Sequence, residues 1–322
     1  MADRLYIVVP CYNEQEVLQE TARRLGDKLD ALVRQGLAAP DSRVLFVDDG
    51  SRDKTWECIR ALHERDARFS GLKLSRNQGH QNALLAGLGV AAERAGLSIS
   101  MDADLQDDID AVDAMLARYR EGCDIVYGVR SSRGSDTFFK RMSAQGFYRF
   151  MAFLGVNIVY NHADYRLMSR RALEGLARFE EANLFLRGIV PLIGYKTAVV
   201  EYERGERFAG ESKYPLKKML SFALNGITSF SIRPIRLITL AGFLIFLASL
   251  AFAVYSVVLK LLGHTVQGWS TLMVSIWLLG GLQLLALGII GEYIGKIYGE
   301  TKRRPRYLTD ELLDKKEDGT NQ

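Results

Sequence analysis

The chain has 322 residues, which is enough for one large domain or two ordinary ones. It carries 42 Lys and Arg residues against 38 Asp and Glu residues, so its net charge is only +4. A charge this small argues against a dedicated nucleic-acid-binding protein. The three cysteines, Cys11, Cys58 and Cys123, are odd in number and lack the spacing of metal ligands, which is typical of a protein in a reducing compartment.

Apolar segments alternate with helical patterns through residues 5–128. The spacing predicts strands at Leu5–Val9, Val44–Val47, Leu72–Leu74, Leu97–Met101 and Asp124–Gly128, and helices at Glu14–Gln35, Asp53–Arg65, Gln81–Arg94 and Ile109–Arg120. Strands that alternate with helices predict an α/β domain with a mostly parallel sheet. In such sheets ligands bind beyond the carboxyl ends of the strands, so the loops at that edge are the ones to inspect.

The loop after the fourth predicted strand is rich in carboxylates. Asp102 and Asp104 stand two residues apart in the run Met101-Asp-Ala-Asp-Leu-Gln-Asp107. Oxygen ligands at this density suit Mg²⁺ or Mn²⁺, and a divalent ion held here would neutralise a departing diphosphate. The alternative is a solvated acidic loop that caps the next helix, and the motif is compatible with both.

Polar, turn-forming residues also follow the first three predicted strands. They occupy Pro10–Glu14, Asp48–Ser51 and Ser75–Gly79. Asp48 and Asp49 offer paired acceptors for a base N–H or for ribose hydroxyls, and Asn77 and Gly79 can approach a ligand closely. Each loop alone is equally explained as a turn followed by a helix cap. Four such loops at one edge of a sheet favour a binding site.

Two uncharged runs, Leu237–Leu259 and Thr265–Gly291, dominate the C-terminal part of the chain. Each exceeds the roughly 20 helical residues that cross a bilayer core, so we expect a hairpin of two transmembrane helices. Lys and Arg residues flank the pair on both outer sides, whereas the link Leu262–Gly268 contains only His264 as a basic residue, which predicts a cytoplasmic-membrane protein with both termini in the cytoplasm. Two buried helices of a soluble core are the alternative.

Amphipathic patterns precede these runs at residues 138–154 and 214–230. The second pattern predicts a helix in the membrane interface, with a helix of the soluble core as the alternative. The tail beyond Leu308 is polar and is expected to be loose.

Several short motifs are shared with one enzyme family. They are Val9-Pro-x-Tyr-Asn-Glu14, Asp48-Asp-Gly-Ser-x-Asp53, Asp102-Ala-Asp-Leu-Gln-Asp107, Tyr127-Gly-Val-Arg130, Asp164-Tyr-Arg-Leu167 and Gly210-Glu-Ser-Lys-Tyr214. With them the chain resembles the family 2 glycosyltransferases of GT-A fold, and more narrowly the polyprenyl-phosphate glycosyltransferases related to dolichol-phosphate mannose synthase. The two spans and Gly291-Glu-Tyr-Ile-Gly-Lys-Ile-Tyr298 are similar to the bacterial two-span branch. The chain departs from the family pattern at Asp108-Ile109, where members often have Pro, and at Tyr127-Gly-Val-Arg130, where Gly-Ser-Arg is commoner.

The resemblance implies a domain plan and a set of site residues. The plan is a cytoplasmic GT-A catalytic domain (1–213), an amphipathic juxtamembrane helix (214–235), a transmembrane hairpin (236–298) and a cytoplasmic tail (299–322). The implied nucleotide-binding residues are Pro10, Tyr12, Glu14, Asp49 and Asp102, to which the loop after the third predicted strand adds Asn77. The implied ligands of Mg²⁺ or Mn²⁺ are Asp102, Asp104 and Gln106. The implied acceptor-phosphate contacts are Arg130, Lys140, Arg141 and Ser143. The implied catalytic residues are Asp104, Asp164 beside the sugar, and Arg207 and Lys213 on the diphosphate.

The reaction that the resemblance implies moves a hexose, either glucose or N-acetylglucosamine, from a UDP-sugar to undecaprenyl (polyprenyl) phosphate with inversion. Extracting the acceptor from the bilayer would cost about 0.8 kcal/mol for each buried CH₂, which explains a site at the membrane surface. The expected partners are the UDP-sugar donor, the polyprenyl phosphate acceptor and membrane lipid, with no nucleic acid. A lipid-sugar flippase and a downstream glycosyltransferase of the cell envelope would use the product.

Three further expectations stay open at this point. Gly280, Gly281 and Gly288 would permit close helix packing in a homo-oligomer. A processive polysaccharide synthase shares the nucleotide-sugar fold, but its Gln-x-x-Arg-Trp motif is not found in this sequence. A non-catalytic, membrane-anchored nucleotide-sugar sensor is the remaining alternative.

Overall fold

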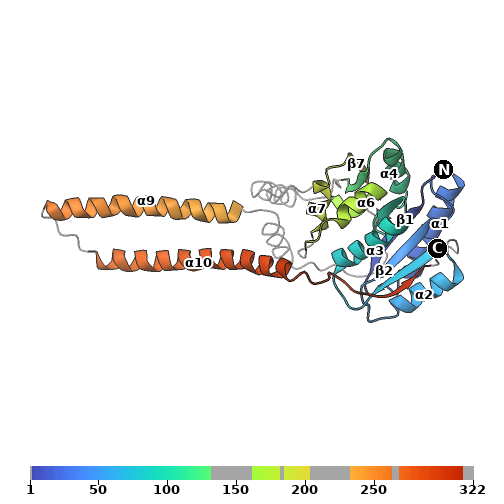
Figure 1. Ribbon diagram of the computed structural model, residues 1–322, viewed down its shortest axis with the longest axis horizontal. Helices are drawn as coiled ribbons and strands as arrows, with labels where there is room; N and C mark the ends of the chain where they lie inside the picture. Colours follow the sequence, from blue (N-terminus) through green and yellow to red (C-terminus); the bar gives the residue numbers. More distant parts are fainter. Residues whose placement is uncertain (1, 132–161, 182–184, 204–232, 263–267, 315–322) are drawn as a thin grey trace. The chain divides into compact units, whose positions relative to one another are not determined.

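The computed structural model describes residues 2–131, 162–181, 185–203, 233–262 and 268–314 (Figure 1). The chain divides into two compact units. The first comprises residues 1–145, 158–213 and 304–322, and the second comprises residues 146–157 and 214–303. The C-terminal end of the chain therefore returns to the unit in which the chain begins.

The first unit is built on an eight-stranded sheet of order β7-β5-β6-β4-β1-β2-β3-β8. The strands are β1 (Leu5–Cys11), β2 (Arg43–Asp48), β3 (Phe69–Leu74), β4 (Leu97–Ser100), β5 (Ile125–Arg130), β6 (His162–Ser169), β7 (Thr197–Tyr202) and β8 (Thr309–Leu313). Strands β4, β1, β2 and β3 pair in parallel, as do β5 and β7, whereas β6 runs antiparallel to both β4 and β5. The predicted mostly parallel α/β sheet is confirmed.

Helices cover both faces of this sheet. They are α1 (Leu18–Arg34), α2 (Thr55–Arg65), α3 (His80–Arg94), α4 (Ala111–Arg120), α6 (Arg170–Ala177) and α7 (Leu186–Leu192). Leu5, Ile7 and Val9 point into one core with residues of α1, α2 and α4, so the alternate residues of β1 face the other side. There α3 lies directly on the sheet, because a Cβ at Gly87 would come within 2.4 Å of Val8 and 2.7 Å of Val47.

All nine elements predicted for residues 5–128 are present, with ends that differ by a few residues. Strands β6, β7 and β8 and helices α6 and α7 were not predicted. The expectation of a loose tail beyond Leu308 is wrong for β8, which pairs antiparallel with β3. The reason is that Asp314, just after β8, is buried in an ion pair with Arg43 and holds the strand in the sheet.

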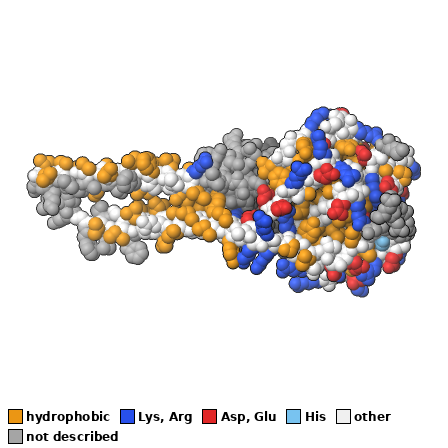
Figure 2. Space-filling view, in the orientation of Figure 1, with side chains coloured by type: hydrophobic (Ala, Val, Ile, Leu, Met, Phe, Trp, Pro, Cys, Tyr) orange, Lys and Arg blue, Asp and Glu red, His pale blue; other side chains and the backbone are white. Residues whose placement is uncertain are grey.

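The second unit contains two long apolar helices, α9 (Arg233–Leu261) and α10 (Trp269–Thr301), which contact each other (Figure 1). Helix α9 covers the first predicted run, and α10 begins at Trp269 within the second run and continues beyond its end; each is long and apolar enough to cross a membrane by length and composition. Large apolar side chains are exposed along both helices, among them Phe252 and Leu284 (Figure 2). The predicted amphipathic segments at 138–154 and 214–230 lie outside the described residues.

Candidate active site

One edge of the sheet gathers the sequence motifs that fall within the described residues. Strands β1, β2, β3, β4, β5 and β7 all end there, and β6, which runs the opposite way, begins there. Asp102 follows the end of β4, and Asp164 lies near the start of β6. The strand-end residues of four predicted loops and the Asp164 motif thus meet at a single edge, as the parallel arrangement predicts.

The loops after β1 and β2 are joined by hydrogen bonds. The backbone N–H of Asn13 donates to Ser51 Oγ (3.0 Å), and the N–H of Arg52 donates back to Asn13 Oδ1 (2.9 Å). The N–H of Glu14 donates to Thr55 Oγ1 (2.9 Å). This pairing fixes the loop that carries the predicted nucleotide residues. Pro10 is buried within β1, and Tyr12 is 40% exposed at the edge of the sheet.

Asp49 anchors the loop after β3. Its two carboxylate oxygens accept the backbone N–H groups of Gln78 (2.7 Å) and Gly79 (2.9 Å). Gly50 lets the two loops touch, since a Cβ there would lie 2.5 Å from the carbonyl carbon of Arg76. Asp49, predicted to bind the nucleotide, therefore supports this loop, and Asn77 lies exposed within it.

A histidine lies between the two main carboxylates of the edge. His80 is the first residue of α3, and its Nε2 is 3.6 Å from Asp102 Oδ1 and 3.6 Å from Asp164 Oδ2. Both distances suit an ion pair and exceed a good hydrogen bond. The structure thus brings two predicted site residues together through a third that was not predicted.

Two guanidinium groups hold Asp164 from other directions. Arg166 Nη2 donates to Asp164 Oδ1 (2.8 Å), and Arg187 Nη2 of α7 lies 3.3 Å from Oδ2. Burial opposes ionisation of Asp164, but His80, Arg166 and Arg187 together hold its pKa well below the usual range. Asp164 is therefore an ionised carboxylate at neutral pH.

Asp102 has the opposite electrostatic environment. Burial raises the pKa of Asp102 to about 6; the charge of His80 opposes the rise, and the carboxylates of Asp107, Asp164 and Asp104 add to it. Asp102 is thus a buried carboxylate on which three other carboxylates act, and the imidazole of His80 is the strongest charge that opposes them. A cation bound at this point would relieve the repulsion.

The residues present fit a divalent ion of the Mg²⁺ or Mn²⁺ type. Asp102, Asp104 and Gln106 offer oxygen donors, which these ions prefer. Within the described ranges, no group of three His, Cys, Asp or Glu side chains is arranged to hold a metal by itself. Mg²⁺ is commonly bound by one or two carboxylates together with substrate phosphates and water, which suits this incomplete protein site.

The end of the acidic loop is tied to β5 and β7. The Tyr202 hydroxyl donates to Asp107 Oδ1 (2.5 Å), and Arg130 Nη2 lies 3.5 Å from the same oxygen. Asp107 is almost fully buried, so this contact fixes the loop rather than a ligand. Arg130, predicted to bind the acceptor phosphate, thus lies beside the acidic loop with its side chain 32% exposed.

Some predicted residues cannot be placed, and some important ones were not predicted. Lys140, Arg141, Ser143, Arg207 and Lys213 lie outside the described residues. Arg166 could have been found from its spacing, because residues two apart on a strand share a face with Asp164. The short helix that carries Arg187 has no sequence motif.

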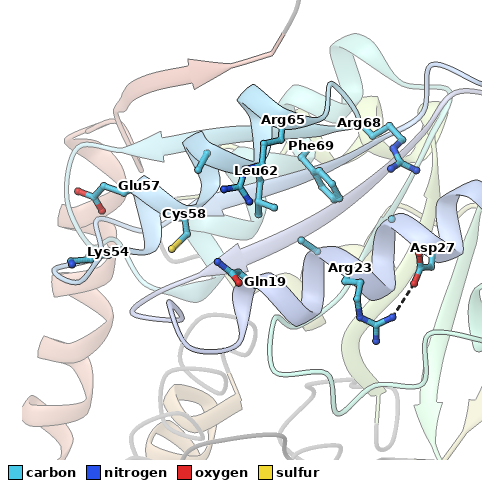
Figure 3. A pocket seen from close by; sticks show the side chains of 13 residues that line it. Gln19, Arg23, Asp27, Lys54, Glu57, Cys58, Leu62, Arg65, Arg68 and Phe69 are labelled. Carbon is cyan, nitrogen blue, oxygen red and sulfur yellow. Dashed lines mark hydrogen bonds and ion pairs between the residues drawn. The ribbon is translucent and has the colours of Figure 1, made fainter.

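Two hollows formed by described residues of the first unit can be compared with the predicted site. One, of about 660 Å³, is lined by Gln106–Asp110, Glu203 and residues of α1. The other, of about 500 Å³, runs between α1 and α2 and reaches Phe69 at the start of β3 (Figure 3). Its lining contains none of the predicted site residues, and its Arg23 is paired with Asp27. Because the first hollow includes Gln106 of the acidic loop and the second includes no predicted site residue, we place the site at the strand edge.

Comparisons with known proteins agree with this architecture. The family profile "Glycosyl transferase family 2" matches residues 6–176, and the profile "GtrB C-terminal hairpin" matches residues 233–297. The fold and the strand-edge site define a glycosyltransferase of GT-A type with two apolar C-terminal helices. The chain belongs to glycosyl transferase family 2.

Similar proteins extend over almost the whole chain. A Bacillus subtilis protein named "Uncharacterized glycosyltransferase YkoT" is 59% identical over 95% of this chain and 91% of its own. The "Bactoprenol glucosyl transferase" of Shigella phage SfV is 38% identical over 95% of this chain and 97% of its own. Among solved structures, glucosyl-3-phosphoglycerate synthase from Mycobacterium tuberculosis is 21% identical, with a TM-score of 0.45, over 71% of this chain and 79% of its own.

Proposed function

We propose that this chain transfers a hexose from a UDP-sugar to a polyprenyl phosphate of the bactoprenol type, with glucose as the first sugar to test. The observation that carries the proposal is the Asp102–His80–Asp164 cluster at the strand edge of a chain that also bears two apolar helices. The similarity to bactoprenol glucosyl transferases, which extends over 95% of this chain, supports the choice of glucose and of the acceptor.

The acceptor needs little activation by the protein. A phosphate monoester has its second pKa near 6, so it is largely dianionic at neutral pH and is already a nucleophile. Its oxygen would attack the anomeric carbon while UDP leaves from the opposite face, which inverts the configuration. The protein must then position the two substrates and stabilise negative charge on the departing diphosphate.

The described residues divide these tasks. Asp102 and Asp104, with Gln106, would hold the divalent ion, which supplies positive charge to the diphosphate when it is bound. Tyr12 has an exposed ring where the base of the nucleotide would lie. Arg130 lies beside the acidic loop, and the positive charge of its guanidinium group would attract the acceptor phosphate there.

Asp164 is better suited to orientation than to proton transfer. A general base works best when its pKa is near the working pH, and the pKa of Asp164 is held far below that by His80, Arg166 and Arg187. We infer that its carboxylate holds a sugar hydroxyl and keeps Arg187 in place.

The proposal is tested by supplying membranes that contain the chain with radiolabelled UDP-glucose or UDP-N-acetylglucosamine, undecaprenyl phosphate, and Mg²⁺ or Mn²⁺. Label that becomes extractable into organic solvent only when the acceptor is added is the expected result, and mass analysis identifies the sugar. Absence of a lipid product with every common activated hexose rejects the proposal.

The same assay separates the alternatives. A processive polysaccharide synthase would convert the donor into a polymer that stays out of the organic phase. A nucleotide-sugar sensor would bind the donor and leave it unreacted. Use of the product by a flippase and a second glycosyltransferase, and self-association of the chain, remain parts of the proposal that need separate experiments.

A further inference from the structure

His80 belongs to the cluster that carries the proposed function, but the proposed reaction assigns it no task at the donor. It lies at the carboxyl edge of the sheet, where Nε2 is 3.6 Å from a carboxylate oxygen of Asp102 and 3.6 Å from one of Asp164. The two carboxylates belong to different strands, one following β4 and the other within β6. Its side chain is 44% exposed, so it borders the space that a substrate would enter.

Contacts with the loop after β2 fix the position of the loop before His80. Both oxygens of Asp49 hold the N–H groups of Gln78 and Gly79, and the backbone of Arg76 packs so closely on Gly50 that no Cβ fits between them. Gly79 has φ of +87°, a left-handed conformation that turns the chain into α3. His80 is thus located by the neighbouring loop of β2 as well as by its own helix.

The charges around His80 explain why an imidazole is needed there. Asp164 has two arginines, Arg166 and Arg187, as further partners. Among the charges near Asp102, that of His80 has the largest effect on the pKa of Asp102: it lowers the pKa, whereas three carboxylates raise it. A protonated imidazole attracts both carboxylates at these distances, and the neutral tautomer with its proton on Nε2 still offers them an N–H donor.

We propose that His80 is a positioning residue, which holds the Asp102 carboxylate against Asp164 in the orientation that receives the divalent ion of the donor diphosphate. The inference rests on the proposed use of a nucleotide-sugar donor. The contacts of Asp49 and Gly50 with the loop before α3 then serve to hold this imidazole at the strand edge. Partners that orient metal ligands typically change metal affinity or activity by about 10–100-fold when they are removed.

The test compares His80→Phe, which keeps a ring but loses the N–H, with His80→Gln, whose Nε2 can still donate at a similar reach. Mn²⁺ binding to the full-length, detergent-solubilised chain is measured by electron paramagnetic resonance in the presence of UDP. We expect His80→Phe to weaken Mn²⁺ binding by about 10–100-fold and His80→Gln by only a few-fold. His80→Ala removes the N–H without added bulk and serves if the Phe variant does not fold.

A transfer assay supplies the second measurement. The KM for the donor and the Mn²⁺ requirement should rise in His80→Phe, while the KM for the polyprenyl phosphate stays within about twofold. Unchanged Mn²⁺ binding in His80→Phe and His80→Ala overturns the inference, and so does a His80→Gln variant as weak as His80→Phe. If the wild-type chain binds Mn²⁺ and UDP in this manner but transfers nothing to polyprenyl phosphate, the acceptor assignment fails and the role of His80 stands.

Discussion

At the scale of single residues, the acidic loop makes a sharp prediction for Asp104. Its Oδ1 accepts the backbone N–H of Gln106 (3.2 Å), and an Asn side chain can keep that hydrogen bond. Asp104→Asn should therefore fold normally but lose one negative oxygen donor for the divalent ion. We expect transfer to fall by at least about a hundredfold, as is usual when a stabilising charge is lost from a transition state. The measurement is the lipid-linked product formed at saturating Mn²⁺.

Asp108→Asn is the matched control for that variant. Asp108 lies in the same loop and carries the same charge, but it is exposed, and its Oδ1 accepts the N–H of Asp110 (2.9 Å), which Asn also permits. Transfer by Asp108→Asn should stay within about twofold of wild type. Equal losses in both variants would mean that the net charge of the loop matters and that Asp104 has no specific role.

The sequence predicted the strand-end carboxylates because their position follows from local pattern. Asp102 and Asp104 come directly after an apolar strand, and parallel strands bring such ends to one edge. His80 was visible in the sequence only as the end of a polar loop. Its importance depends on Asp164, which lies 84 residues later and reaches the edge through β6, a strand that the pattern did not reveal.

At the scale of secondary-structure elements, β8 should contribute measurably to the stability of the catalytic unit. The buried carboxylate of Asp314 pairs with Arg43 (2.9 Å) and Arg94 (2.5 Å) and accepts the Tyr6 hydroxyl (3.0 Å). Asp314→Asn removes the negative charge that pairs with Arg43 and Arg94. We expect a loss of about 2–3 kcal/mol, below the roughly 3–5 kcal/mol for fully buried pairs, because Arg94 is a quarter exposed and Asn keeps some hydrogen bonds.

Asp310→Asn provides the comparison within the same strand. Asp310 pairs with Lys73 (3.0 Å), but its side chain is 52% exposed, so its loss should change stability by less than about 1 kcal/mol. Thermal unfolding of the solubilised chain should show a midpoint lower by roughly 5–10 °C for Asp314→Asn and nearly unchanged for Asp310→Asn. Equal midpoints for the two variants would show that the buried pair does not stabilise the unit.

The pattern of residues does not reveal β8, for physical reasons. The segment Thr309–Leu313 has two acidic residues in five and no apolar alternation, because an edge strand needs few buried side chains. Asp314, which follows the strand, pairs with Arg43 and Arg94, and both arginines lie more than 200 residues earlier in the chain. The first five strands and four helices, in contrast, carry their own periodic patterns and were predicted within a few residues of their observed ends.

At the scale of the whole molecule, the sheet constrains how the chain crosses a membrane. Strand β7 precedes the apolar helices α9 and α10, β8 follows them, and both strands belong to one sheet. A single sheet lies on one side of a bilayer, so a chain that spans the membrane with α9 and α10 would cross it an even number of times between Tyr202 and Thr309. This argument from strand pairing is independent of the distribution of Lys and Arg, and it leads to the same hairpin.

The hairpin predicts opposite accessibility for the two ends of α10. Gly268→Cys, just before the helix, should react with a membrane-impermeant maleimide from outside intact cells, and Lys302→Cys, just after it, should react only after the cells are lysed. The background is a Cys58→Ser chain, in which the remaining Cys11 and Cys123 are buried. Labelling of both positions from the same side would contradict a single crossing by α10, and with it the hairpin. Labelling of Lys302→Cys alone in intact cells would keep the hairpin and reverse its orientation, which would place the donor site away from cytoplasmic UDP-sugars.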